Sequence, residues 1–190
     1  MKTKIEHFVL LVSENDDQLA FSKLYQYYFP GLFSFASGFL KDNQHSEEVV
    51  LDVFLNLWQN RKTLPAVSNL SVYLYVSVKH ACISFLRKQK IIHYGEMGDQ
   101  FIYTFDTPEE NAISKENINA INEAIASLPS RCRLIFRLIK EERLKYHEVA
   151  ELLDISVKTV ETQMSIANKK LIKVLKLCLP EYKHKAFYRK

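Results

Sequence analysis

The chain has 190 residues, of which 47% are hydrophobic and 25% are charged. This composition is close to that of soluble globular proteins, so it excludes an intrinsically disordered chain, a collagen-like chain and a coiled-coil rod. Four glycines and five prolines are too few for the many turns of a β-rich fold. We therefore expect one domain or two small ones, built mostly of helices.

The net charge of +4 is distributed unevenly along the chain. Residues 1–99 contain ten basic and ten acidic residues, whereas residues 143–190 contain eleven basic and five acidic ones. A second basic patch, with no acidic residue, occupies residues 79–90. Two separate basic patches favour a polyanionic partner that is contacted at two places.

The three cysteines and the N-terminal residues indicate a cytosolic protein. Cys82, Cys132 and Cys178 form no CxxC motif, so we expect reduced thiols. The apolar run from Phe8 to Val12 is too short for a signal peptide. No apolar stretch reaches the 18 or so residues that a membrane span needs.

Four helices are predicted in the first 90 residues. An apolar stripe over residues 21–39, interrupted by Pro30, predicts helices at 16–29 and 31–40, or one kinked helix. The next helix is predicted at 46–61 with Ser46 as its N-cap, and the fourth follows a loop and runs from residue 70 to about 87. The inner faces of these last two helices are expected to be Val50, Val53, Phe54 and Leu57, and Leu70, Leu74, Ser77, Ala81 and Phe85.

A domain boundary is predicted after these helices because the helical spacing of apolar residues fades between residues 88 and 105. Thr107, Pro108 and Glu110 form a capping box with proline at the first helical position, so a new helix begins there and ends at Pro129. Three more helices are expected at residues 131–142, 144–153 and 157–179, followed by a polar, basic tail.

Residues 144–167 have the spacing of a helix-turn-helix, with a small residue at Ala150, a turn at Asp154 and a β-branched core residue at Val160. Aspartate tolerates the left-handed conformation that the turn requires, and Ser156 can cap the second helix. The expected inner face of that helix is Val160, Met164, Ala167 and Leu171. An ordinary helical hairpin with a solvated polar face is the alternative.

Three sets of polar residues are candidates for binding. The second helix of the motif carries amines, hydroxyls and an amide that can reach base edges and phosphates, namely Lys158, Thr159, Thr162, Gln163, Ser165 and Lys169. The helix at 46–61 carries an outward stripe of Glu48, Asp52, Asn56 and Gln59, which on most proteins is merely solvated. Tyr73, Tyr75, Lys79 and His80 have the aromatic and cationic composition on which single-stranded bases stack, although the rings could equally belong to the core.

These residues together resemble an extracytoplasmic-function (ECF) sigma factor of the sigma-70 family over about residues 16–179. The resemblance is carried by Phe21, Leu24 and Tyr25, by the run from Glu47 to Trp58, by Tyr73, Leu74, Arg87 and Lys88, and by Leu128, Pro129, Arg133 to Phe136 and Glu148 to Glu161. Within the family, the sequence is most similar to Bacteroidetes-type members that respond to membrane anti-sigma proteins.

The resemblance implies an all-α protein with two helical domains joined by a flexible linker. It implies region 2 at residues 1–90, a linker at 91–106, region 4 with its helix-turn-helix at 107–179, and a basic tail at 180–190. Region 2 would bind core RNA polymerase and the minus-ten element, and region 4 would bind the minus-thirty-five element. The protein would act in the cytoplasm, held at times at the inner membrane face by an anti-sigma factor.

The same resemblance assigns roles to the candidate residues. Glu48, Asp52, Asn56 and Gln59 would contact the β′ coiled coil of core polymerase, whose β flap is a further expected partner. The melted minus-ten strand would be held by Asn69, Tyr73, Tyr75, Lys79, His80, Arg87 and Lys88. The minus-thirty-five duplex would be read by Lys158, Thr159, Thr162, Gln163, Ser165 and Lys169. Leu51, His80, Ser84 and Asp154 depart from the usual family residues, and such departures bear on promoter preference.

An enzyme is the least favoured class. The six histidines show no metal-binding spacing and no glycine-rich phosphate loop is present, so we expect no catalytic residue, metal, cofactor or small-molecule substrate. A helix-turn-helix regulator without a sigma role is the closer alternative. A receiver domain in the first half would need alternating strands and helices, which residues 16–88 do not show.

Overall fold

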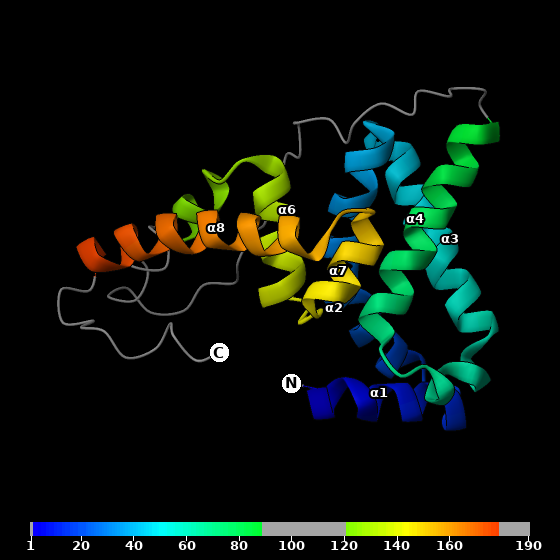
Figure 1. The fold of residues 1–190 in the computed structure, drawn as a ribbon. Helices are drawn as coiled ribbons and strands as arrows, with labels where there is room; N and C mark the ends of the chain where they lie inside the picture. Colours follow the sequence, from blue (N-terminus) through cyan, green and yellow to red (C-terminus); the bar gives the residue numbers. More distant parts are fainter. Residues whose placement is uncertain (1, 89–120, 179–190) are drawn as a thin grey trace. The chain divides into compact units, whose positions relative to one another are not determined.

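The computed structural model describes residues 2–88 and 121–178, and every regular element in these two ranges is a helix (Figure 1). The prediction of an all-α fold is therefore confirmed for the described residues. The chain divides into two compact units, Met1–Ile102 and Tyr103–Lys190. The predicted linker at 91–106, the helix start at Thr107 and the basic tail at 180–190 lie outside the described residues.

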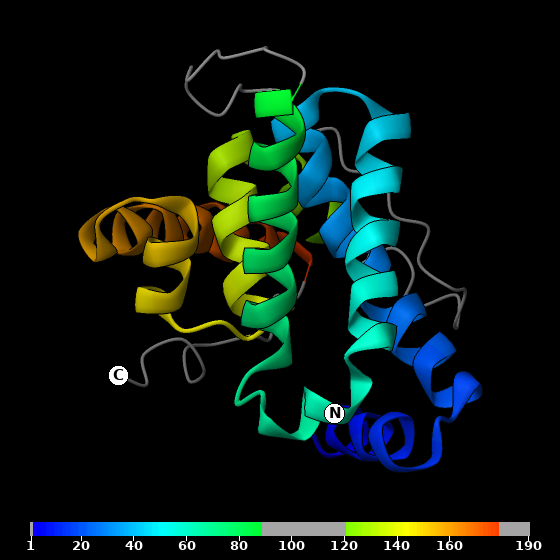
Figure 2. The same ribbon diagram turned by 90° about the vertical axis from the view of Figure 1, so that its right-hand side faces the viewer.

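The first unit is built around one long central helix. Its elements are α1 (Lys2–Asn15), α2 (Gln18–Leu40), α3 (Asn43–Gln59), the 3-10 helix η1 (Arg61–Ala66) and α4 (Leu70–Lys88). Helix α2 packs against α1, α3 and α4, and α1 also packs against η1. Figures 1 and 2 show α1 lying across one end of the long helices α3 and α4.

Residues 18–40 form a single helix with Pro30 inside it, so the prediction of two separate helices was wrong and the alternative of one helix holds. Asp17 begins this helix because its Oδ1 accepts hydrogen bonds from the backbone N–H groups of Leu19 and Ala20 at 2.8 and 2.9 Å. The proline removes one helical hydrogen bond. Burial of the apolar face on both sides of Pro30, at Tyr28 and Leu32, offsets that loss.

Helix α3 begins three residues earlier than predicted. Its N-cap is Asp42, whose Oδ1 accepts from the backbone N–H of His45 at 2.8 Å. Ser46, the predicted cap, lies buried one turn inside the helix, and its hydroxyl donates to the carbonyl of Asp42. Asp42 and Ser46 are both of residue types that cap helices, and they lie four positions apart. Asp42 is the one that caps α3.

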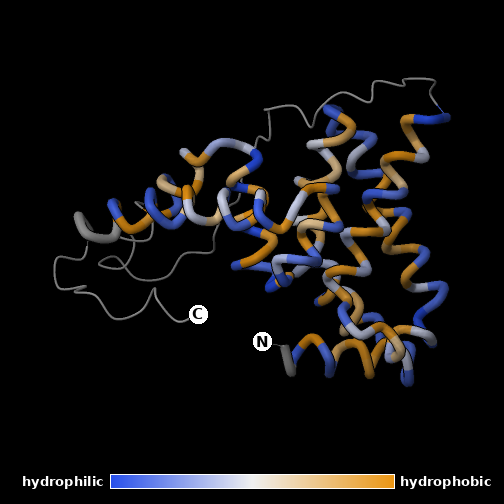
Figure 3. The backbone as a smooth tube through the Cα atoms, in the orientation of Figure 1, coloured by the Kyte–Doolittle hydropathy of each residue, from blue (hydrophilic) through white to orange (hydrophobic). Residues whose placement is uncertain are grey.

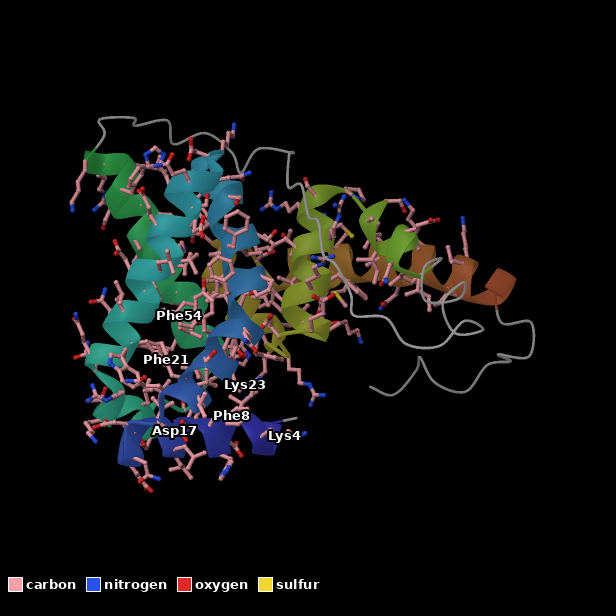
Figure 4. All side chains as sticks on the ribbon, turned by 180° about the vertical axis from the view of Figure 1, so that it is seen from behind. Lys4, Phe8, Asp17, Phe21, Lys23 and Phe54 are labelled. Atoms are coloured by element: carbon pink, nitrogen blue, oxygen red, sulfur yellow. The ribbon has the colours of Figure 1, made fainter. Side chains whose placement is uncertain are left out.

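The buried faces agree with prediction for α3 and differ for α4. On α3 all four expected inner residues are buried, and Phe54 meets Phe21 of α2 edge to face with ring centroids 6.1 Å apart (Figure 4). On α4 the predicted stripe is displaced, because the buried residues are Leu70, Leu74, Tyr75, Val78 and Cys82. Ser77, Ala81 and Phe85 are only half-buried.

Helix α1 was not predicted. Its apolar residues cluster in one short run without a clear helical period, and what holds them is packing against η1 and α2, which no local pattern reveals. Val12 and Ser13 are its buried residues.

The second unit contains a helical segment at residues 121–126, then α6 (Ser130–Lys140), α7 (Tyr146–Leu153) and α8 (Val157–Cys178). Helix α8 packs against both α6 and α7. The core is apolar, with Leu128, Ile135, Leu138 and Met164 among its most deeply buried side chains. Figure 3 shows polar and apolar residues alternating along these helices, as expected where one face of a helix is buried.

Prediction for the buried thiol. Cys82 has no exposed surface, and burial raises the pKa of its thiol to about 12. The thiolate is the reactive form of cysteine, so a raised pKa slows alkylation near neutral pH, and the surrounding core blocks access as well. We expect Cys82 to resist alkylation in the native chain and to react fully in urea, as measured by mass spectrometry of each cysteine peptide. Alkylation of native Cys82 at the rate of a free thiol would contradict this packing.

Candidate nucleic-acid interface

Helices α7 and α8 are joined by a tight turn at residues 154–156. Asp154 has φ 55° and ψ 49°, the left-handed conformation predicted for it. The backbone N–H of Ile155 donates to the carbonyl of Ala150 at 3.0 Å, which satisfies one of the carbonyls left free at the end of α7. Ser156 then caps α8, since its Oγ accepts from the backbone N–H of Thr159 at 3.0 Å. The predicted turn and cap are both confirmed.

The inner face of α8 fixes this helix on the second unit. The predicted residues Val160, Met164, Ala167 and Leu171 are all buried. The small Ala150 of α7 is buried as well. On α6, the Cys132 thiol lies 3.2 Å from the carbonyl of Gln163. With one face buried in this way, the opposite face of α8 is held in a defined orientation.

That outer face carries the six residues predicted to read duplex DNA. Lys158, Thr162, Ser165 and Lys169 are exposed, and Thr159 and Gln163 are half-buried. Amines, hydroxyls and an amide on one helix can contact phosphates and the donors and acceptors of the major groove.

Several of these polar groups have local partners. Lys158 Nζ lies 3.1 Å from a carboxylate oxygen of Glu161, and Thr162 Oγ1 donates to the carbonyl of Lys158 at 2.9 Å. An exposed ion pair on a helix contributes only about 0.3–0.5 kcal/mol, so Lys158 can exchange Glu161 for a phosphate. Glu161 was not predicted as a partner of Lys158, although a carboxylate three residues after a lysine on a helix indicates such a pair.

Helix α3 presents a different kind of surface. The four predicted residues of its outward stripe, Glu48, Asp52, Asn56 and Gln59, are all exposed. Leu51 and Leu55 are exposed beside them, and 59% of the surface of Leu55 is accessible. Carboxylates repel nucleic acid, and exposed leucines one turn apart suit a protein partner. Neither leucine was predicted as a contact, although two leucines four residues apart and outside the inner stripe of α3 indicate an exposed apolar patch.

Helix α4 and the residue before it carry the third set. Tyr73 is 40% exposed, and His80, Arg87 and Lys88 are exposed. Lys79 and Asn69 are half-buried, and Asn69 Oδ1 accepts from the backbone N–H of Val72 at 3.3 Å at the start of α4. One exposed tyrosine and several cations therefore share this helix.

Tyr75 does not belong to this surface. Only 3% of it is exposed, and its ring packs edge to face against Phe35 with centroids 5.2 Å apart. Such a ring cannot stack on a base, so the prediction that Tyr75 contacts DNA was wrong. The error follows from the displaced inner stripe of α4, which turns Tyr75 rather than Ser77 toward the core.

The segment between α3 and α4 is tied to the turn between α1 and α2. One carboxylate oxygen of Asp16 lies 2.5 Å from Arg61 Nε and 3.1 Å from Lys62 Nζ. These contacts join residues 45 or more positions apart in sequence, and no spacing rule predicts them.

Neither a metal centre nor a membrane span is found in the part of the chain that the structure describes. No group of three or more histidine, cysteine, aspartate or glutamate side chains there could hold a metal ion. Among the same residues, no helix combines the length and the apolar character needed to cross a membrane.

Two models of known protein families match this chain. Residues 24–91 match the model of sigma-70 region 2, and residues 118–171 match the model of sigma-70 region 4. The two matches follow one another in the chain and together cover more than half of it. The chain belongs to the sigma-70 family. Helices α3 and α4 lie within region 2, and the helix-turn-helix lies within region 4.

Individual relatives agree with this placement in the sigma-70 family. The chain is 25% identical to the ECF RNA polymerase sigma factor SigW of Bacillus subtilis over 170 residues, which are 84% of this chain and 91% of SigW. It is 26% identical to the ECF RNA polymerase sigma factor SigX of the same organism over 172 residues, or 85% and 86% of the two chains. These similarities support an ECF-type member of the sigma-70 family.

Among solved structures, the chain is similar to the sigma factor RpoE of Bartonella quintana, which was crystallised with the anti-sigma factor NepR. The sequence identity is 18% and the TM-score is 0.49, over 83% of this chain and 97% of that chain.

Prediction for the turn of the helix-turn-helix. A β-branched residue is strained in the left-handed conformation, so Asp154→Val should destabilise α7 and α8 by about 1–2 kcal/mol, whereas Asp154→Gly should be neutral or stabilising. Hydrogen–deuterium exchange of the α7 and α8 amides measures this difference. Glu151→Val, at an exposed helical position, is the control and should cost less than about 1 kcal/mol. Equal losses for the glycine and valine variants of Asp154 would contradict the left-handed turn.

Proposed function

We propose that this chain binds core RNA polymerase as an ECF sigma factor, directs it to promoters and holds the melted DNA strand during initiation. The observation that carries the proposal is the occurrence of region 2 and region 4 in order in one chain. A helix-turn-helix regulator needs only the second of these regions. A sigma factor needs both, because it must contact the polymerase and the unpaired strand as well as the duplex.

We assign each exposed surface one task. The α3 stripe, with Leu51 and Leu55, docks on the β′ coiled coil of core polymerase, since it combines carboxylates with apolar side chains. The outer face of α8 reads the minus-thirty-five duplex, where its lysines and hydroxyls can reach phosphates and base edges. Within the chain we assign residues 1–90 to region 2, 91–106 to a linker, 107–179 to region 4 and 180–190 to a basic tail, and the β flap is the expected polymerase contact of region 4.

The segment from η1 to α4 holds the melted minus-ten strand in this proposal. The residues assigned to it are Asn69, Tyr73, Lys79, His80, Arg87 and Lys88. Exposed Tyr73 offers a ring for stacking, and the cations on α4 offer charges for the phosphates. The loss of Tyr75 from the set leaves Tyr73 as the aromatic candidate on the exposed side of α4.

Regulation and location follow from the same proposal. We infer that the protein acts in the cytoplasm, where core polymerase and promoter DNA are found, and that a membrane-associated anti-sigma factor controls it, as in the Bacteroidetes-type members that the sequence resembles. We assign it no catalytic residue, cofactor or small-molecule substrate. Its chemistry is the binding of a protein and a polyanion.

Prediction for the polymerase contact. Asp52→Lys reverses a charge in the middle of the α3 stripe, and a repulsive pair at an interface costs several kcal/mol. We expect binding to core enzyme to fall at least tenfold in a competition pull-down, with the helical circular dichroism signal unchanged. Glu6→Lys makes the same charge change at an exposed position of α1 and serves as the control. Wild-type binding by the Asp52 variant would refute the assignment of α3.

Prediction for strand opening. With core enzyme present, the protein should make thymines near a minus-ten element reactive to permanganate, whereas the isolated chain should bind duplex promoter only weakly. Replacing Lys79 and Arg87 together by Ala should abolish the reactivity and leave core binding intact, because both cations contact the strand rather than the polymerase.

The control for this experiment is a double alanine variant of Lys4 and Lys23, which removes two exposed cations elsewhere in the first unit. It should open the promoter normally. If the isolated chain bound a duplex operator tightly and no strand opened on addition of core enzyme, the proposed sigma function would be wrong. The chain would then be a helix-turn-helix regulator.

A further inference from the structure

The turn between α1 and α2 makes a two-cation contact with the start of η1. Asp16 accepts from Arg61 Nε at 2.5 Å and lies 3.1 Å from Lys62 Nζ through the same oxygen. Asp16 itself has a positive φ of 53°, which places it at the point where α1 ends and the chain turns into α2. A single carboxylate thus ties the N-terminal helix to two consecutive residues of the segment that follows α3.

Arg61 is held from three sides. Besides Asp16, its Nη1 donates to the carbonyl of Trp58 at 2.9 Å, and its guanidinium lies 4.7 Å from the centroid of the Trp58 ring. That ring in turn meets Phe21 of α2, with centroids 5.0 Å apart. Arg61 is therefore anchored to α3 through Trp58 and to the α1–α2 turn through Asp16.

The two contacts fix the beginning of a nine-residue segment, 61–69, that connects α3 to α4. Its middle is fixed by Leu64, which is buried, and its end by Asn69, whose side chain caps α4. Most other side chains of η1 and the loop are exposed, namely Lys62, Thr63, Pro65, Ala66 and Ser68, and Val67 is half-buried. The segment is anchored at its start, middle and end, and most of its other side chains are exposed.

We propose that Asp16 is a positioning residue for strand opening, which holds segment 61–69 in the orientation that receives the melted minus-ten strand. This inference rests on the proposed function, which places that strand against the segment and α4. A site that captures unstacked bases must hold its contact residues to within about half an ångström. Asp16 contributes by fixing the backbone of the segment that leads to Asn69 and the start of α4, without touching DNA itself.

The charge of Asp16 does not change near physiological pH. The hydrogen bonds from Arg61 and Lys62 lower the pKa of Asp16 to about 2, so its carboxylate is ionised throughout the range in which the protein works. The ion pairs of Asp16 with Arg61 and Lys62 therefore do not depend on pH in this range.

Electrostatics and positioning predict opposite effects of removing the Asp16 charge. Asp16→Asn leaves two cations without their anion, which raises the positive potential of the segment and strengthens or preserves nonspecific attraction to DNA. If the charge alone mattered, opening would therefore stay the same or increase. If position matters, opening falls even though DNA affinity does not.

The experiment compares Asp16→Asn, Arg61→Gln and the double variant in reconstituted holoenzyme. We expect each single variant to lower permanganate reactivity at the minus-ten element by about threefold to fivefold, the size expected for a partly exposed charge contact. The double variant should lose less than the product of the two single losses, because the two variants share the contact between Asp16 and Arg61. Core binding and the salt-dependent affinity for nonspecific duplex should not decrease for Asp16→Asn.

Glu14→Gln is the matched control, since it neutralises an exposed carboxylate two residues earlier and should open the promoter normally. If Asp16→Asn melts below the assay temperature, Asp16→Glu replaces it, because this variant keeps the charge and moves the carboxylate by one methylene. Full opening by the Asp16 variant that is assayed, or an equal loss with Glu14→Gln, would overturn the inference alone. Absence of opening with the wild-type protein would overturn the proposed function and this inference together.

Discussion

Burial of α2 on three sides organises the whole of the first unit. This helix contacts α1, α3 and α4, and its residues Leu24, Leu32 and Phe35 are almost completely buried. Burial of such side chains stabilises by about 1.5–3 kcal/mol each, which is large compared with the few tenths contributed by any surface pair. The faces of α3 and α4 that do not meet this core are therefore the ones left for partners, and their orientation is set by packing rather than by the polar residues on them.

The second unit depends in a similar way on a single backbone conformation. With Asp154 in the left-handed region, α7 ends and α8 departs in a direction that buries Val160 and Met164 against α6 and α7. Because this face of α8 is buried, the polar residues on its other side face outward. In both units the proposed binding surfaces consist of the residues that stay exposed once the apolar stripes are buried, and that packing sets their orientation.

Much of this could be predicted because the signals are local. The inner stripe of α8 and the cap at Ser156 follow from spacing alone, and the structure has both. Tyr75 was misplaced because two apolar stripes fit α4 almost equally well, and only the fit against Phe35 decides between them. The contact of Asp16 with Arg61 joins segments that are distant in sequence, so no periodicity could indicate it. Spacing thus predicted α3, α8 and their polar faces, while tertiary packing decided α1, the inner face of α4, and which rings and charges meet.

Helix α1 lies before residue 24, where the match to sigma-70 region 2 begins. It nevertheless supplies buried Val12 and Ser13, and the turn that follows it holds the start of η1. The residues that match the region 2 model, 24–91, are consequently not the same as the residues that pack together as the first unit, Met1–Ile102. A fragment that begins at residue 24 would keep α3 and α4 but would lack α1 and the first turns of α2, and it would leave apolar surface of α2 and η1 uncovered.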